Sequence, residues 1–398
     1  MPDKQEHGEA TRTPRILHVL EATLGGTLRY MENIAEATAG MDLISAFAYG
    51  TARADSRLEP FLNRIAGLGW KRYPVDMRRE IRPWNDLKAW FQLRRVVGHF
   101  APDIIHCHSS KAGALGRTST YLLRNQPARV YSPHALAAPL GSIYLKIEKQ
   151  LSRSTERFVA VSDSEHKEIF DFSLAPATSI SVVYPSVDTG YFQPSSQAFA
   201  RETLGIDSAP LILAIGRITG QKDPIAFLRV IERVYAKQSD VKAIWLGSGE
   251  GKEEFLSAIE AAHMQNVIRV VPWQHDVRLY IAAADVVLST SRFESFGYVT
   301  AEALAMKRPV VATDVSGTRD ILQSRFGEWM YPLDQTDLAA DLILKLLRDH
   351  ALSAVTGDLG RAEIERRFST ERMREHLMQA YRTVLSQPSP NLTQAVAL

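Results

Sequence analysis

The stretch from Leu279 to Val311 decides the fold and reads LYIAAADVVLSTSRFESFGYVTAEALAMKRPVV. Its first half contains a short apolar run, Ala284–Leu288, which is typical of a buried strand. A small polar turn, Ser289–Ser291, follows that run. A helical pattern completes the stretch, so it predicts a strand–turn–helix unit.

Two glutamates, Glu294 and Glu302, lie eight positions apart in this unit, with Ser295, Phe296 and Gly297 after the first. We expect the helix to begin near residues 295–297, with Glu294 at its edge and Glu302 one and a half to two turns further. A helix N-terminus after a glycine turn is suited to bind an anion. Carboxylates beside it can accept hydrogen bonds from sugar and ribose hydroxyls. Taken alone, Glu294 is also compatible with a simple partner of the helix dipole.

The spacing Glu294-Ser-Phe-Gly-Tyr-Val-Thr-Ala-Glu302 resembles the E-x7-E signature of the retaining glycosyltransferases of family 4, or group 1. The resemblance extends from about Arg15 to Leu385. It implies an α/β protein with the GT-B fold, in which two Rossmann-like doubly wound domains face a cleft.

The composition is that of an ordinary globular protein. A length of 398 residues is enough for two domains. The net charge of +2 gives no indication of a nucleic-acid partner. The single cysteine, Cys107, excludes a disulfide within the chain and favours a reducing compartment. With no apolar run long enough to span a bilayer and a polar N-terminus, we expect a cytoplasmic protein.

We expect disordered tails at residues 1–14 and 387–398. Between them we expect an acceptor-side domain over 15–192, a polar linker, and a nucleotide-sugar-binding domain over 198–370. The resemblance implies that a C-terminal helix, about 371–386 within a helical stretch from Glu363 to Leu385, crosses back onto the first domain.

The first domain opens with a strand, Arg15–Leu20, then Gly25 and Gly26, then a helical pattern. This order is compatible with a phosphate-approaching turn and equally with a simple turn. It resembles the family's G-G-x-x-R loop, with Arg29 as the arginine, which implies a loop that faces donor phosphate and acceptor.

Two histidines follow later strands of this domain, His108 after Asp103–Cys107 and His134 after Arg129–Ser132. Ligands of open α/β sheets bind at the carboxyl ends of the strands, although a single histidine is also compatible with a structural role. The segment DIIHCH from Asp103 resembles the family's D-x-x-H-x-H. The resemblance implies that His134 lies near the reacting sugar.

The second domain opens with a strand, Leu211–Ile215, followed by Gly216, Arg217 and Lys222. Cations released from a strand end at this spacing can bind a diphosphate from two sides, although a solvated basic loop is the alternative. The segment resembles the family's G-R-x-x-x-x-K-G loop, with Asp223 in place of the last glycine. Further on, DVSGTRD (314–320) resembles the family's G-G-x-x-E loop and retains Gly317.

The resemblance therefore implies transfer of a sugar from a UDP-, GDP- or other nucleotide diphosphate sugar to an acceptor hydroxyl. The implied catalytic residues are His134, Arg217, Lys222 and Glu294. The implied nucleotide-sugar-binding residues are Gly25, Gly26, Gly216, Arg217, Lys222, Glu294, Ser295, Phe296, Gly297 and Glu302. We expect no cofactor and no metal, because two cations already balance the diphosphate and no Asp-x-Asp is evident in these motifs.

A basic, aromatic stretch over Arg72–Phe100 contains Trp84, Trp90 and Phe91 among several arginines. It is compatible with an ordinary solvated surface helix. It is also compatible with peripheral binding to an anionic surface, here the inner face of the cytoplasmic membrane. The second interpretation suits a lipid-linked acceptor in the synthesis of cell-surface polysaccharide, lipopolysaccharide or glycolipid.

Two other functions remain open at this point. One is a sugar-nucleotide epimerase of the same fold, which would release its product without an acceptor. The other is a catalytically silent nucleotide-sugar-binding module, against which the combination of Arg217, Lys222, Glu294 and Glu302 argues.

Overall fold

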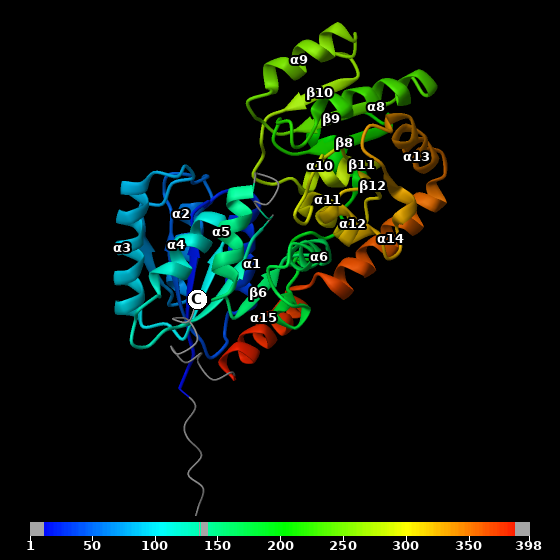
Figure 1. Ribbon diagram of the computed structural model, residues 1–398. Coiled ribbons are helices and arrows are strands. Elements are labelled where there is room, and N and C mark those ends of the chain that lie inside the picture. Colours follow the sequence, from blue (N-terminus) through cyan, green and yellow to red (C-terminus); the bar gives the residue numbers. More distant parts are fainter. Residues whose placement is uncertain (1–11, 135, 137–141, 387–398) are drawn as a thin grey trace, which may run out of the picture. The chain divides into compact units, whose positions relative to one another are not determined.

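A computed structural model describes residues 12–134, 136 and 142–386 (Figure 1). The expected disorder of residues 1–11 and 387–398 therefore lies outside the described residues. The chain divides into two compact units. Unit 1 comprises residues 1–160, 166–183 and 374–398, and unit 2 comprises residues 161–165 and 184–373.

Unit 1 is built on a parallel sheet with strand order β3-β2-β1-β4-β5-β6-β7. Its strands are β1 (Arg15–Leu20), β2 (Ile44–Tyr49), β3 (Lys71–Pro74), β4 (Ile104–His108), β5 (Ala128–Ser132), β6 (Arg157–Ala160) and β7 (Ile180–Val182). Its helices are α1 (Gly25–Ala37), α2 (Leu58–Gly67), α3 (Pro83–Phe100), α4 (Ser110–Ser119), α5 (Ser142–Ser152), most of α6 (Asp163–Asp171), the 3-10 turn η2 (Ala177–Ser179) and most of α15 (Thr370–Leu385).

The two faces of this sheet differ in chemistry, because alternate residues of a strand point to opposite faces. Leu17 and Val19 of β1 pack with Leu93 of α3 in an apolar core. The opposite face carries histidines and is contacted by α15, where the hydroxyl of Tyr381 lies 2.8 Å from a ring nitrogen of His106. One face therefore supplies the apolar core, and the other holds buried polar side chains.

Unit 2 is built on a second parallel sheet, with strand order β10-β9-β8-β11-β12-β13. Its strands are β8 (Leu211–Ile215), β9 (Lys242–Leu246), β10 (Ile268–Val271), β11 (Val286–Ser289), β12 (Val310–Thr313) and β13 (Met330–Tyr331). Its helices are α7 (Gln197–Leu204), α8 (Pro224–Lys237), α9 (Lys252–Ala261), α10 (Arg278–Ala283), α11 (Tyr298–Ala305), α12 (Ser316–Leu322), the 3-10 turn η3 (Gly327–Trp329), α13 (Thr336–Arg348) and α14 (His350–Arg367).

In each sheet the chain adds strands first on one side of the unit's first strand and then on its other side. This switch lies between β1 and β4 in unit 1 and between β8 and β11 in unit 2. This is the doubly wound, Rossmann-like arrangement, and it confirms the predicted α/β fold class. The loops that follow β8 and β11 leave neighbouring strands at such a switch point. Ligands of doubly wound sheets bind at this position.

Several predicted bounds were wrong, among them the strand predicted over Asp103–Cys107, which is Ile104–His108, and the strand predicted from Arg129, which begins at Ala128. The apolar run Ala284–Leu288 was expected to be the strand, but β11 covers Val286–Ser289, because Ala284 and Asp285 still belong to the turn after α10. The helical stretch from Glu363 to Leu385 breaks at Phe368. That ring is buried against Tyr184 and Phe296, and its carbonyl accepts a hydrogen bond from the amide of Val187.

Candidate functional site

The centre of the candidate site is an ion pair between Lys222, in the loop after β8, and Glu294, in the loop after β11. Ser291 donates a hydrogen bond to the same carboxylate oxygen at 2.8 Å. The two charged side chains are 21% and 12% exposed, so both are largely removed from water yet reach the surface. The fold therefore places one cation and one anion side by side at the switch point.

Gly216 makes the position of Lys222 possible. A Cβ atom at Gly216 would lie 3.2 Å from three methylene carbons of Lys222. The lysine stem thus packs directly over the glycine backbone at the end of β8. A larger residue at this position would displace the stem and the ammonium group with it.

Polar contacts join the two loops. Thr290 donates from its hydroxyl to the backbone oxygen of Lys222 at 2.8 Å, and Gln221 donates from its amide to the oxygen of Phe293 at 3.1 Å. Arg292 donates to Asp223 at 2.7 Å. These contacts fix the two loops that carry Lys222 and Glu294 relative to each other.

Asp223 explains the departure from the family pattern. Its φ is 48°, in the left-handed region where glycine is the favoured residue and Asp is tolerated better than most others. Its carboxylate accepts a hydrogen bond from the amide of Ala226 at 3.0 Å and so caps α8, which begins with Pro224. Asp223 therefore takes the backbone shape of the missing glycine and adds a helix cap.

The helix after Glu294 begins at Tyr298, with Gly297 as its N-cap at φ 93°. Because the helix starts later than predicted, Glu302 lies only a little over one turn into α11. Its side chain is buried. Ser295 is half-buried. Phe296 is buried against Tyr184 and Phe368, so its ring anchors the turn to the core of unit 2.

Gly317 holds the Glu294 turn from the other side. Its amide and the hydroxyl of Ser316 both donate to the backbone oxygen of Glu294 at 3.0 Å. A Cβ atom at Gly317 would lie 2.6 Å from the backbone nitrogen of Phe296. Only glycine allows this close approach.

A small pocket opens at this place. Lys222, Glu294 and Gly297 line it together with Trp245, Ser291 and Thr300. Arg217 does not line this pocket: it is exposed and makes no hydrogen bond or ion pair with any residue that the structure describes. A larger cavity of about 670 Å³ lies at the opposite ends of the strands, beside Leu211 and Ile268, and contains none of the predicted site residues.

In unit 1, Gly25 begins α1 with φ 58°. Its amide donates to Asp55 at 3.0 Å, and its carbonyl accepts from Arg57 at 2.9 Å. Gly26 is exposed in the first turn of the helix. The peptide groups of Gly25 are therefore already occupied by side chains from the next loop, which anchors the glycine turn.

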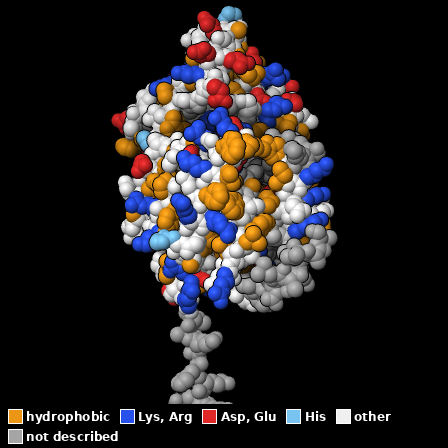
Figure 2. Space-filling model, turned by 60° about the vertical axis from the view of Figure 1, so that its left-hand side comes forward, with side chains coloured by type: hydrophobic (Ala, Val, Ile, Leu, Met, Phe, Trp, Pro, Cys, Tyr) orange, Lys and Arg blue, Asp and Glu red, His pale blue; other side chains and the backbone are white. Residues whose placement is uncertain are grey.

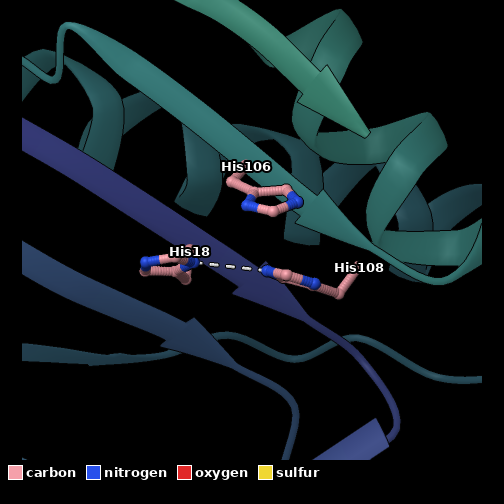
Figure 3. A group of neighbouring side chains, drawn as sticks. All are labelled: His18, His106 and His108. Carbon is pink, nitrogen blue, oxygen red and sulfur yellow. Dashed lines mark hydrogen bonds between the residues drawn. The ribbon is translucent and has the colours of Figure 1, made fainter. Parts of the chain in front are cut away.

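The other predicted residue of unit 1, His134, belongs to a cluster of four histidines, three of which Figure 3 shows. His18 on β1 is paired in register with His106 on β4, and His108 lies two residues further on the same face. His18 Nδ1 lies 3.3 Å from His108 Nε2, and His108 Nδ1 lies 3.2 Å from His134 Nε2. Burial lowers the pKa of His18 to about 3, and it lowers the pKa values of His106 and His108 well below 6.5.

Nitrogens of His18, His106 and His108 lie within 4.8 Å of one another, which raises the question of a metal. The ring nitrogens of His106 are both engaged, with Tyr381 at 2.8 Å and with Ser132 at 2.9 Å. His108 likewise uses both of its nitrogens within the cluster. The trio as arranged is therefore a hydrogen-bonded cluster without spare ligand atoms on His106 or His108.

His18 was not among the predicted site residues, and its partner His108 lies ninety positions away in the chain. Thr290 and Ser291 were predicted only as part of a turn, although their hydroxyls bind Lys222 and Glu294. Polar residues directly after a buried strand were the available signal for the two hydroxyls.

Two family models match successive parts of this chain. The profile of glycosyltransferase family 4 matches residues 24–191, and that of the glycosyl transferases group 1 matches residues 209–349. A D-inositol 3-phosphate glycosyltransferase from Nocardioides is 29% identical over 319 residues, 72% of this chain and 68% of its own length. The capsular polysaccharide biosynthesis glycosyltransferase CapM of Staphylococcus aureus is 24% identical and is matched over 83% of this chain and 88% of its own length.

Solved structures share the fold at low identity. The Anabaena protein HepE in complex with UDP-glucose has a TM-score of 0.79 at 19% identity, covering 94% of this chain and all of the other. The sucrose-phosphate synthase of Thermosynechococcus elongatus has a TM-score of 0.78 at 17% identity, covering 93% and 99%.

Proposed function

This chain belongs to the family 4 glycosyltransferases of the GT-B fold, and we propose that it transfers a sugar from a nucleoside diphosphate sugar to an acceptor hydroxyl with retention of configuration. The observation that carries the proposal is the Lys222–Glu294 pair in the pocket at the β8/β11 switch point. The pair offers a cation for the diphosphate and a carboxylate for sugar hydroxyls, at the position where doubly wound sheets bind nucleotides.

In the proposed reaction the bond between the anomeric carbon and the diphosphate oxygen breaks. Its electron pair goes to the leaving diphosphate, whose growing charge Lys222 and Arg217 stabilise. The acceptor oxygen attacks the same face of the sugar, and its proton passes to the leaving phosphate oxygen. Glu294 holds the donor-sugar hydroxyls, Glu302 the ribose, and His134 the sugar or acceptor.

The positive charge in this proposal comes from side chains, and Arg217 is exposed and able to reorient toward a ligand. We therefore propose that turnover requires no metal ion. An equal transfer rate with and without EDTA supports the metal-free proposal. A rate that EDTA abolishes and that added Mg²⁺ or Mn²⁺ restores refutes it.

The test of the main proposal is a panel of nucleotide sugars, beginning with UDP-glucose because the Anabaena protein HepE was solved in complex with it. Each is incubated with the enzyme, with and without simple sugars, inositol phosphate and a bacterial lipid extract. We expect nucleoside diphosphate release that depends on an acceptor, and a product with the donor's anomeric configuration by NMR. Conversion of the donor without any acceptor would instead identify an epimerase, and binding without turnover a silent module.

We further propose that a lipid-linked acceptor is reached at an anionic membrane surface by the N-terminal half of α3. In the part of the chain that the structure describes, no helix is long and apolar enough to cross a membrane. Trp84 is 83% exposed and Phe91 is 53% exposed, while Trp90 packs against Phe91 and lies half-buried. Figure 2 shows hydrophobic side chains on this face among many Lys and Arg side chains.

The arginines before and along α3 divide into two groups. Arg79 and Arg82, just before the helix, and Arg95 in its second half are exposed, whereas Arg94 donates to the backbone oxygen of Tyr121 at 2.6 Å and so has a structural role. Exposed cations on an element with an exposed tryptophan match the chemistry of an anionic lipid surface. The match with CapM supports a polymeric cell-surface product as the class to test.

A further inference from the structure

The four histidines of unit 1 form a connected arrangement that the transfer reaction proposed above does not require. His18 lies inside β1, His108 at the end of β4, and His134 two residues beyond β5. The chain of contacts from His18 through His108 to His134 therefore crosses three strands. It leads from the buried centre of the sheet to the edge where the strands end.

We propose that His18 and His108 are positioning residues for His134: their chain of ring-to-ring hydrogen bonds fixes the orientation and the tautomer of the His134 ring. The proposal rests on the proposed function, in which His134 contacts the sugar or acceptor. It adds a specific mechanism by which two residues that never reach the substrate control that contact.

The number of donors and acceptors on each ring couples the three tautomers. A neutral imidazole has one N–H donor and one acceptor nitrogen. Each contact between two rings needs one donor, so once His108 donates to one neighbour, its other nitrogen must accept from the other neighbour. The tautomers of His18, His108 and His134 therefore change together or not at all.

The surroundings keep the three rings in place. The ring of His18 stacks on Trp70 at 5.2 Å with an interplanar angle of 8°. Tyr30 packs edge-on against His134 at 4.8 Å and against His108 at 6.1 Å. Among the described residues, the rings that face these three histidines are thus those of His106, Tyr30 and Trp70. None of the three carries a formal charge while His106 is neutral.

The three hydrogen-bonded imidazole rings must be neutral, because a protonated imidazole has two donors and no acceptor. Burial lowers the pKa of His134, as it does that of His18, to about 3. At pH 6 to 8 all rings of the chain are therefore neutral. His134 then serves as a fixed hydrogen-bonding group and not as a group that gains and loses a proton in this range.

His106 provides a matched control. It lies in the same cluster, with its ring 4.1 Å from that of His108, but its nitrogens bind Tyr381 and Ser132. A His106→Gln substitution disturbs the cluster without interrupting the chain. His108→Phe and His18→Phe interrupt it, and His108→Gln partly restores it, because an amide has both a donor and an acceptor.

The experiment is ¹⁵N NMR of histidine-labelled full-length protein from pH 5.5 to 8, with resonances assigned by single substitutions. We expect one neutral tautomer for His134 and scalar coupling across both ring-to-ring hydrogen bonds in the wild type. His18→Phe should give a mixture of His134 tautomers although His18 does not touch His134, and His106→Gln should leave the His134 signals unchanged. His108→Gln should return His134 toward a single tautomer.

A wild type without either coupling, or folded His18→Phe and His108→Phe variants with the wild-type His134 spectrum, would overturn the proposal. So would one tightly bound zinc ion per chain in the purified protein, if it were lost in the His106→Gln variant. These readings need no substrate and stand apart from the transfer assay. Where transfer is measured, His18→Phe should lower kcat about tenfold with an unchanged KM for the donor.

Discussion

The ammonium group of Lys222 is paired with the carboxylate of Glu294. The two residues lie 72 positions apart and belong to loops that are brought together only by the pairing of β8 with β11. A diphosphate that binds Lys222 must therefore share the lysine with Glu294. The carboxylate orients the cation at the pocket, and the two side chains act as one unit.

This pairing predicts strong non-additivity. Lys222→Ala should lower kcat/KM by about 10²-fold or more, because a charge-assisted contact to the leaving group is lost. Glu294→Ala should have an effect of similar size. The kcat/KM of the double variant should be only slightly below that of the less active single variant. Each single substitution already disrupts the shared unit. Steady-state kinetics decide the matter, and effects that simply multiply would contradict it.

Arg217 gives a separate prediction, because it is exposed and has no partner among the described residues. Arg217→Ala should lower kcat/KM by about 10²-fold if the arginine meets the diphosphate in the transition state. Arg233→Ala is the control, since Arg233 lies half-buried on α8 and pairs with Asp337. Equal activity of both variants would remove Arg217 from the mechanism.

The glycine under Lys222 allows a finer test. Gly216→Ala should lower kcat/KM about tenfold, because the new methyl group would lie 3.2 Å from the lysine stem and push the ammonium group away. Gly220→Ala in the same loop is the matched control, since a Cβ atom there meets nothing within 4 Å. Thermal unfolding should separate loss of activity from loss of fold. A folded Gly216→Ala enzyme with the wild-type kcat/KM would contradict this prediction, because the side chain of Lys222 could then shift without loss of activity.

Much of this architecture could be predicted because strands such as β8 and β11 are buried apolar runs with turn residues after them. Arg15–Leu20 and Leu211–Ile215 were predicted with the bounds that the structure has. The approach of Lys222 to Glu294 could not be derived from spacing, since it depends on strand order within the sheet. Only the family resemblance related the two loops.

The histidine cluster shows a second limit of sequence reading. His18 interrupts an otherwise apolar strand, which by periodicity alone is an unfavourable core residue. Its partners lie on β4, so its hydrogen bonding becomes visible only when β1 and β4 are placed side by side. The role of Phe368 in ending α14 was hidden for the same reason, because its aromatic partners are distant in sequence.

The buried histidines predict that stability falls in mild acid. Their pKa values are lowered in the folded state, to about 3 for His18, whereas an unfolded histidine has its ordinary value near 6.5. The unfolded state therefore binds more protons below pH 6.5. The stabilisation is complete above that pH and is lost as the pH falls toward 3, by about 1.4 kcal/mol per pH unit for each histidine.

Urea unfolding followed by circular dichroism at pH 7.5 and at pH 5 measures this effect. His18→Phe should lose less of its unfolding free energy between the two pH values than the wild type does. His275→Gln, which changes an exposed histidine, should behave as the wild type. An unfolding midpoint in the wild type that is the same at both pH values would contradict the prediction.

The exposed tryptophan of α3 predicts reversible binding to anionic vesicles. In a flotation assay we expect the wild type to bind vesicles that contain phosphatidylglycerol at low salt, to bind them less at high salt, and to ignore neutral vesicles. Trp84→Ser should weaken binding several-fold through loss of an interfacial aromatic, and Arg82→Ala about fivefold through loss of roughly 1 kcal/mol. Trp273→Ser is the control, because Trp273 is 52% exposed but belongs to unit 2 and not to α3. Equal partition to both kinds of vesicle, or an equal effect of both tryptophan substitutions, would refute a membrane role for α3 and leave the glycosyltransferase family unchanged.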